Sequence, residues 1–138
     1  MDQREWEKFY GGELDRFDER VYATLNRKGQ IYINRHTYHL IGSPQQVVFY
    51  FSRRRDSILI AASSIKTAES FTVKPKQVGF VIHASPFCRY YGIRTDGTIQ
   101  FVRPEIDNHR LKLDLTRTLP LTAPKRPKRN LDAEARTK

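Results

Sequence analysis

Apolar and polar residues alternate along the first part of the chain body in the way typical of β-strands, in which successive side chains face opposite sides of a sheet. Four segments alternate in this way: residues 21–26, 30–33, 47–52 and 57–62. Lys28-Gly29 separates the first two segments as a turn, and the polar residues 53–56 separate the last two as a hairpin loop. The pattern therefore predicts a mainly β structure.

A short helix is predicted between the second and third of these strands. Asn34 is a suitable N-cap, because its side chain can accept a hydrogen bond from a free amide of the first turn. The helix is expected over residues 35–41. Gly42 suits a left-handed helix end, and Pro44 cannot continue a helix.

The same order of signals returns after the connection at residues 63–69. Its members are strands at 71–73, 80–83, 99–101 and 111–115, a turn at Gly79, a helix over 87–91 between Ser85-Pro86 and Gly92, and a loop at 104–109. An internal duplication is the main organisational prediction. Chance similarity between two β-rich stretches is the alternative.

Each copy is too short to bury a stable core alone. We therefore expect the units 20–62 and 70–116 to share one core, so that a single chain forms a pseudo-two-fold β-barrel. The expected fold class is α+β, mainly β with short helices. The chain is expected to be a monomeric pseudo-dimer, and pairing of such chains into a higher oligomer stays open.

Charge gives the strongest indication of a partner. The 138-residue chain has 25 Lys and Arg against 15 Asp and Glu, a net charge of +10. A strongly basic protein favours polyanions, above all nucleic acid. Residues 1–19 carry a net charge of −4, residues 20–116 carry +9 and residues 117–138 carry +5. The positive charge therefore belongs to the body and the tail.

The two ends of the chain are expected to differ from the body. Residues 117–138 are basic and rich in Pro, which predicts a disordered tail that either binds phosphates or only keeps the protein soluble. Residues 1–19 predict an acidic helical segment with Trp6 and Tyr10 on one face. That segment either covers an edge of the barrel, binds a protein partner or competes with nucleic acid for the basic body.

Several other chemistries find no support in the sequence. The single cysteine, Cys88, excludes internal disulfides, and its apolar neighbours predict a buried side chain. His36 and His39 have no Cys, Asp or Glu close by, so we expect neither a metal site nor another cofactor. No phosphate-binding glycine loop or nucleophile motif indicates an enzyme. No stretch is apolar enough for a membrane span, and the cytoplasm is the expected location.

The most specific pattern lies in the first unit. Lys28-Gly29-Gln30-Ile31, a short helix ending in Ile41-Gly42 and a hairpin ending in Ile58-Leu59-Ile60 resemble the swapped-hairpin unit of the SpoVT/AbrB family of bacterial DNA-binding proteins. Over residues 20–116 the chain is similar to the MraZ-like arrangement, which has two such units in one chain. The resemblance implies a barrel of interleaved hairpins and a nucleoid-associated transcriptional regulator that binds double-stranded DNA.

The first unit also departs from the family pattern. The family usually has Pro where Asn34 stands, and paired arginines where Tyr38 and His39 stand. Family-style DNA contacts are therefore not carried over to these two helix positions, and the resemblance implies no particular DNA sequence.

The resemblance implies which side chains face DNA. Arg27, Lys28 and Arg35 are expected to lie near one another as phosphate ligands, joined by Arg20 if the first two strands are antiparallel. Amides can form two hydrogen bonds to adenine, so three of them are candidates for reading base edges. They are Asn26, Gln30 and Asn34. The second unit's counterpart of the basic patch is Lys74, Lys76, Arg89 and Arg94.

The densest basic run of the body is Arg53-Arg54-Arg55, in the predicted hairpin loop. It is either a phosphate-binding loop or a solvated one. We expect it to lie far along the hairpin from the Lys28 turn.

Two other functions stay open. An RNA-binding or single-strand-binding β-barrel would use exposed Tyr22, Tyr32 and Tyr50 to stack on bases. An antitoxin-like or adaptor protein would act through its terminal segments, with residues 1–19 as the arm that binds a protein partner.

Overall fold

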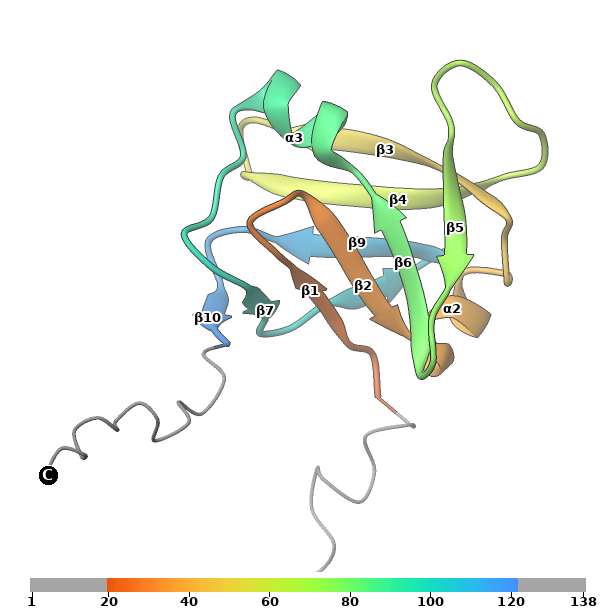
Figure 1. Ribbon diagram of the computed structural model, residues 1–138, viewed down its shortest axis with the longest axis horizontal. Helices are drawn as coiled ribbons and strands as arrows, with labels where there is room; N and C mark the ends of the chain where they lie inside the picture. Colours follow the sequence, from red (N-terminus) through yellow and green to blue (C-terminus); the bar gives the residue numbers. More distant parts are fainter. Residues whose placement is uncertain (1–19, 122–138) are drawn as a thin grey trace, which may run out of the picture.

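Antiparallel pairing joins every neighbouring pair of strands in the computed structural model, which describes residues 20–121 (Figure 1). The strands are β1 (Ala23–Leu25), β2 (Gln30–Asn34), β3 (Gln46–Ser52), β4 (Ser57–Ser63), β5 (Phe71–Pro75), β6 (Gly79–His83), β7 (Ile99–Phe101), β8 (Glu105–Asp107), β9 (Arg110–Asp114) and β10 (Thr118–Pro120). Their order in the sheet is β10-β7-β1-β2-β6-β5-β3-β4-β9-β8. The expected mainly β structure is confirmed.

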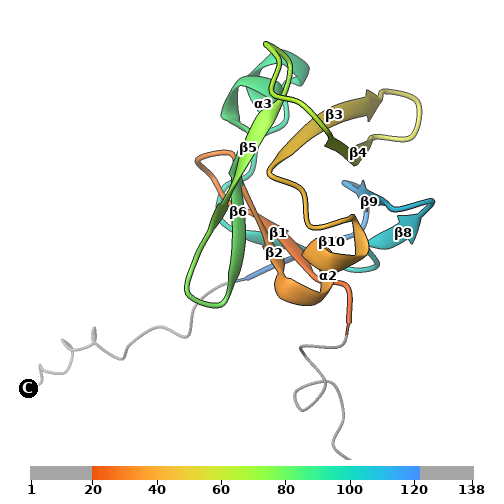
Figure 2. The same cartoon turned by 90° about the vertical axis from the view of Figure 1, so that its right-hand side faces the viewer.

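The sheet curls around a single core. Figure 2 shows β6 and β5 on one side of the molecule and β4, β9 and β8 on the other. The fully buried side chains come from both parts of the chain and include Ile31, Ile58, Ile82, Phe101 and Leu113. Both halves of the body therefore contribute to one hydrophobic core, as a chain of this length requires.

Two short helices follow β2 and β6. Helix α2 (Arg35–Leu40) has the predicted N-cap, because the Asn34 side chain accepts a hydrogen bond from the backbone N–H of Thr37. Helix α3 (Ser85–Tyr91) ends at Gly92, whose φ of 69° is the predicted left-handed conformation. Its N-cap is Ala84, and the helix begins two residues before the predicted range 87–91.

Strands β2 and β6 are neighbours in the sheet and pair along their whole length. Ile31 is directly opposite Ile82, and both side chains are fully buried. Outward from this pair, β1 and then β7 lie on one side, and β5 and then β3 lie on the other. Because β2 and β6 are antiparallel, the start of each strand lies beside the end of the other.

The second half of the chain does not form the hairpin that its sequence predicted. Strand β7 pairs with β1 and β10, whereas β9 pairs with β4 and β8. Residues 104–109, predicted as a loop, contain the extra strand β8. Asn108 and His109 both have positive φ, and such a two-residue turn matches the twist of a tight hairpin. The Asn-His pair is an unusual sequence for this turn, which is why the sequence analysis missed it.

The predicted start of the disordered tail at residue 117 is wrong. Residues 118–120 form β10, and the carbonyl of Arg117 accepts a hydrogen bond from Val102 N–H at 2.9 Å. Pro120 is tolerated because β10 is an edge strand, where a missing N–H breaks no ladder. Residues 1–19, with Trp6 and Tyr10, and residues 122–138 lie outside the described part of the chain.

No helix within residues 20–121 is long and apolar enough to cross a membrane.

Replacing Ile31 with Ala is expected to lower the free energy of unfolding by about 2–5 kcal/mol, because the substitution leaves a cavity where the two halves meet. Urea denaturation measures this loss. Ile65→Ala is the matched control, since Ile65 is 64% exposed in the β4–β5 connection, and its expected change is within about 0.5 kcal/mol. Equal losses in both variants would contradict the central position of β2 in the core.

Candidate nucleic-acid interface

Helix α3 is the element on which the candidate site is built, and the β1–β2 turn packs directly on its first residues. The Gly29 carbonyl accepts a hydrogen bond from the Ala84 N–H at 2.8 Å. A Cβ atom on Gly29 would lie 2.7 Å from the Cα of Ser85, and Gly29 has a φ of +83°. Only glycine meets both conditions without strain, so the Lys28-Gly29 signal in the sequence holds the turn against α3.

Asn26 shapes this turn. Its Oδ1 accepts hydrogen bonds from the N–H groups of Lys28 and Gln30 at 3.0 and 2.9 Å, and its Nδ2 donates to Gln30 Oε1 at 2.7 Å. Because the Asn26 side chain stabilises the turn by bonding to its backbone, the side chains at the tip are not needed for this purpose. Arg27 and Lys28 are accordingly exposed beside α3.

A cationic cavity of about 420 Å³ lies between the β1–β2 turn, α3 and the segment 93–96. Four basic side chains line it: Arg27, Lys28, Arg89 and Arg94. Ser85 adds a hydroxyl, which accepts a hydrogen bond from Arg89 Nη1 at 3.3 Å, and Asp96 is the one carboxylate. Basic side chains therefore outnumber carboxylates by four to one at this cavity.

The β3–β4 loop reaches the other end of α3. The Arg53 guanidinium lies 5.2 Å from the centre of the Tyr91 ring, a cation–π distance. Tyr91 in turn packs against Phe51 and Phe87 at 4.6 and 5.1 Å between ring centres. Figure 1 shows the β1–β2 turn, α3 and the β3–β4 loop at the same end of the molecule.

We call this region the α3 surface and define it by five exposed cations. They are Arg27, Lys28, Arg53, Arg89 and Arg94. None of the five forms an ion pair with another residue of the described range 20–121. The Lys28 turn and the arginine loop contact opposite ends of this short helix, at Ser85 and at Tyr91, and Figure 2 shows them on opposite sides of α3.

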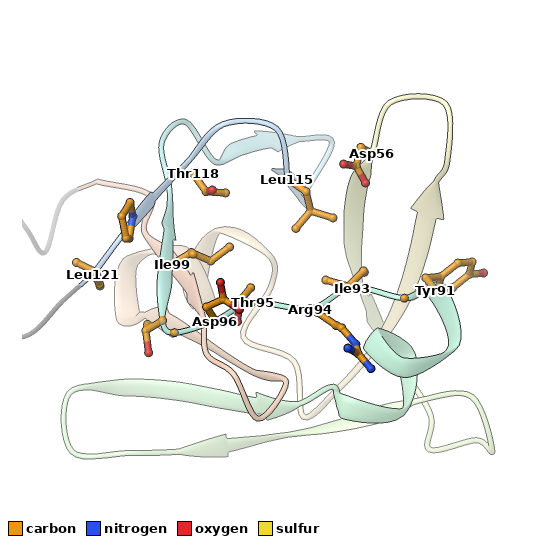
Figure 3. Close-up of a pocket in the computed structure, with 14 residues that line it drawn as sticks. Asp56, Tyr91, Ile93, Arg94, Thr95, Asp96, Ile99, Leu115, Thr118 and Leu121 are labelled. Atoms are coloured by element: carbon orange, nitrogen blue, oxygen red, sulfur yellow. The ribbon is translucent and has the colours of Figure 1, made fainter.

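A second cavity, of about 640 Å³, adjoins the cationic one (Figure 3). The two cavities share the segment 93–96 as a common wall. The second has apolar side chains from Tyr91, Ile99 and Leu115, among others, and the carboxylates of Asp56 and Asp96. Its chemistry is therefore different from that of the cationic cavity, although Arg94 borders both.

The structure divides each of the two predicted basic patches between two ends of the molecule, so that residues of one patch lie beside residues of the other. Arg35 begins α2 at the far end of β2 from Lys28, so the structure does not bring these two together. Arg20 lies at that far end as well, because its carbonyl accepts a hydrogen bond from Asn34 Nδ2 at 2.9 Å. The Lys76 turn precedes Gly79, which pairs with Asn34. The reason is the antiparallel pairing of β2 and β6, which sets the turn before one strand beside the helix after the other.

We call Arg20, Arg35 and Lys76 the α2 end. Figure 1 shows α2 and the β5–β6 turn together, away from α3. Lys74 lies on β5 opposite Val81, between the two ends. Only Arg89 and Arg94 of the predicted second patch belong to the α3 surface.

The predicted base-reading role of Asn34 is wrong, whereas that of Asn26 and Gln30 stays a prediction. Asn34 is 1% exposed, and its side chain caps α2, so it cannot reach a base. Asn26 and Gln30 are bonded to each other, and Gln30 Nε2 lies 3.2 Å from His83 Nδ1. These hydrogen bonds hold the turn and the sheet, which gives the amides structural roles.

The remaining arginines of the β3–β4 loop face other surroundings. Arg54 is exposed at the loop. Arg55 borders a separate cavity with three basic residues that were not predicted as site residues: Arg103, Lys112 and Arg117. Two carboxylates, Glu105 and Asp114, moderate the charge there, and Lys112 Nζ lies 3.9 Å from Glu105. The pairing of β4 with β9 creates this group, and no local sequence signal reveals it.

The predicted stacking tyrosines differ in exposure. Tyr22 and Tyr32 are half-buried and pack edge to face at 6.1 Å, and burial raises the pKa of Tyr22. Tyr50 is 57% exposed on the outer face of β3. Tyr90 on α3 is 76% exposed and was not among the predicted stacking residues.

Cys88 is buried as predicted, and desolvation raises the pKa of its thiol, which keeps it protonated. Within residues 20–121 no group of three or more His, Cys, Asp or Glu side chains is arranged to hold a metal ion.

Comparison of the chain with protein-family models, with curated proteins and with solved structures finds no match in any of the three.

Gly29→Ala is expected to lower the free energy of unfolding by more than about 1 kcal/mol, because the new Cβ meets the backbone of α3 at an unfavourable φ. Gly97→Ala serves as the control, since a Cβ there meets open space, and its effect is expected within about 0.5 kcal/mol. Thermal denaturation of both variants tests the contact. If Gly29→Ala were as stable as Gly97→Ala, the turn would not pack on α3 as described.

Proposed function

We propose that this protein binds double-stranded DNA through the α3 surface and acts as a transcriptional regulator. The observation that carries the proposal is the convergence of five exposed cations, from three separate segments, on one short helix. Cations that form no ion pair with another residue of the range 20–121 are available to bind phosphates. Each phosphate contact releases counterions from the duplex and adds to affinity at low salt.

The dimensions of the α3 surface suit a nucleic-acid backbone. Helix α3 has seven residues and is therefore about 10 Å long. A duplex carries one negative charge for about every 1.7 Å of its axis. A cluster of cations spread along and around such a helix contacts several phosphates at once, whereas a small anion would use only part of it.

The strand order supports the further proposal that the body consists of two related halves, in a SpoVT/AbrB-like swapped-hairpin arrangement. The strand order β7-β1-β2-β6-β5-β3 is symmetric about its centre when β1 is matched with β5, β2 with β6 and β3 with β7. Tyr32 and Val81 form the middle pair of the β2–β6 ladder, and each of these two strands leads into a short helix. Strands that follow one helix pair with strands of the other half, as exchanged hairpins do.

The triple variant Arg27→Ala, Lys28→Ala and Arg89→Ala tests the DNA surface. Affinity for a duplex is expected to fall roughly tenfold or more at low salt, and the slope of log K against log salt is expected to flatten by up to about 2.7, since each lost phosphate contact contributes about 0.9. Fluorescence anisotropy across a salt series measures both quantities.

A second triple variant removes the same amount of charge elsewhere: Arg35→Ala, Lys74→Ala and Lys76→Ala. All three side chains are exposed and lie outside the α3 surface, so the expected loss is clearly smaller than that of the first variant. Equal losses would mean that the protein responds to net charge alone and would contradict the assignment to the α3 surface.

Competition at fixed salt distinguishes the type of nucleic acid. Duplex DNA is expected to displace single-stranded DNA and RNA of the same length. A preference for a single strand would overturn the duplex assignment and favour base stacking, with the exposed Tyr90 as the first ring to test. Enrichment of discrete sites from a random duplex library is expected for a regulator, and failure to enrich any would contradict that role.

A further inference from the structure

We infer that the two adjoining cavities beside α3 form a binding site for a nucleoside monophosphate, with the phosphate in the cationic cavity and the base in its neighbour. This inference goes beyond the proposed DNA binding and does not depend on it. It starts from the concave shape of the site, since a duplex backbone that runs over the surface uses exposed cations and needs no cavity.

The cationic cavity fits a terminal phosphate. Arg27 and Lys28 come from the β1–β2 turn, Arg89 from α3, and Arg94 from the segment after α3, so positive charge surrounds the space from different sides. A phosphate monoester carries a charge of about −1.5 to −2 at pH 7 and has three strong acceptor oxygens. An arginine can bind two of these oxygens at once. A phosphodiester in a strand carries a single charge and so matches four cations less well.

The neighbouring cavity fits the uncharged part of the same molecule. Its walls include Tyr91, Ile93, Ile99 and Leu115, together with hydroxyl groups of threonines (Figure 3). Its volume of about 640 Å³ lies within the range of about 300–1,000 Å³ that is common for small-molecule sites. Aromatic and aliphatic walls with a few polar groups are the usual environment of a flat heterocycle.

Charge determines which way round the ligand binds. Asp96 and Arg94 border both cavities, whereas Asp56 borders only the second and the other three cations only the first. The second cavity therefore has two carboxylates against one guanidinium and disfavours a phosphate, while the first has four cations against one carboxylate. The same carboxylates can accept hydrogen bonds from the amino groups of a base or the hydroxyls of a ribose. The site therefore has a cationic side for the phosphate and an acceptor side for the nucleoside.

Arg94 connects the two sides. It borders both cavities, and the segment 93–96 that carries it is their common wall. Figure 3 labels Arg94 on this wall, with Asp96 on the same segment. A ligand that occupies both cavities must cross this segment beside the guanidinium. Arg94 is exposed and has no ion pair within residues 20–121, so its removal leaves the fold intact.

Two sources present this chemistry: a free nucleotide and the 5′-phosphorylated end of a nucleic acid. Calorimetric titration of the full chain with AMP, adenosine and inorganic phosphate tests the site itself. AMP is expected to bind at least about tenfold more tightly than either part alone, because it uses both cavities. If AMP bound no more tightly than inorganic phosphate, the two-cavity site would be overturned.

Variants then locate the site. Arg94→Ala is expected to weaken AMP binding at least about tenfold by loss of a charge-assisted contact, and Arg94→Lys is expected to recover part of that loss. Arg35→Ala, an exposed arginine at the start of α2, is the matched control and is expected to leave AMP affinity unchanged. Equal effects of Arg94→Ala and Arg35→Ala would overturn the assignment.

Oligonucleotides with and without a 5′-phosphate separate the two sources. A gain in affinity from the 5′-phosphate supports the site as a receptor for nucleic-acid ends, and AMP binding without such a gain supports it as a receptor for free nucleotide. Absence of both would overturn the inference. Salt-dependent duplex binding that persisted in that case would leave the proposed function standing, so the two failures are distinguishable.

Discussion

The antiparallel pairing of β2 with β6 is the constraint on which the rest of the structure depends. Ile31 and Ile82 are paired within it, fully buried, and the other strands of the sheet add outward from β2 and β6. Because the two strands run in opposite directions, the turn that precedes one lies beside the helix that follows the other. The α3 surface exists for this reason: Gly29 packs on Ser85, and the cations of two distant segments become neighbours.

The α3 surface gathers like charges, which repel one another and slightly disfavour the compact state. Arg53 offsets part of this cost by lying against the Tyr91 ring, and Arg89 by donating a hydrogen bond to Ser85. Elsewhere in the described residues Lys112 and Arg110 are paired with Glu105 and Asp107. Binding of an external anion, as proposed above, would remove part of this repulsion.

The three amide side chains have a chemistry that suits base recognition, but in this fold they form hydrogen bonds within the protein. Asn26, Gln30 and Asn34 have the side chains that read adenine in a major groove. In this fold Asn26 closes the turn beneath Arg27 and Lys28, and Asn34 caps α2 from a buried position. A short side chain that can bond to its own backbone serves a turn or a helix cap first, because a buried free amide of the main chain is costly. The amides therefore support the cations without joining them.

Local chemistry was readable from the sequence wherever neighbours along the chain decide the conformation. The alternation over β3 and β4, the Asn34 cap and the left-handed Gly92 all depend on residues a few positions apart. Net charge favours a polyanion as the partner, and this stays a prediction. Contacts between distant segments could not be predicted from the sequence. These are the pairing of β7 with β1, the extra strands β8 and β10, and the positions of Lys28, Arg53 and Arg89 around α3. Strand partners are selected by the packing of one shared core, and only the tertiary structure decides which exposed cations become neighbours.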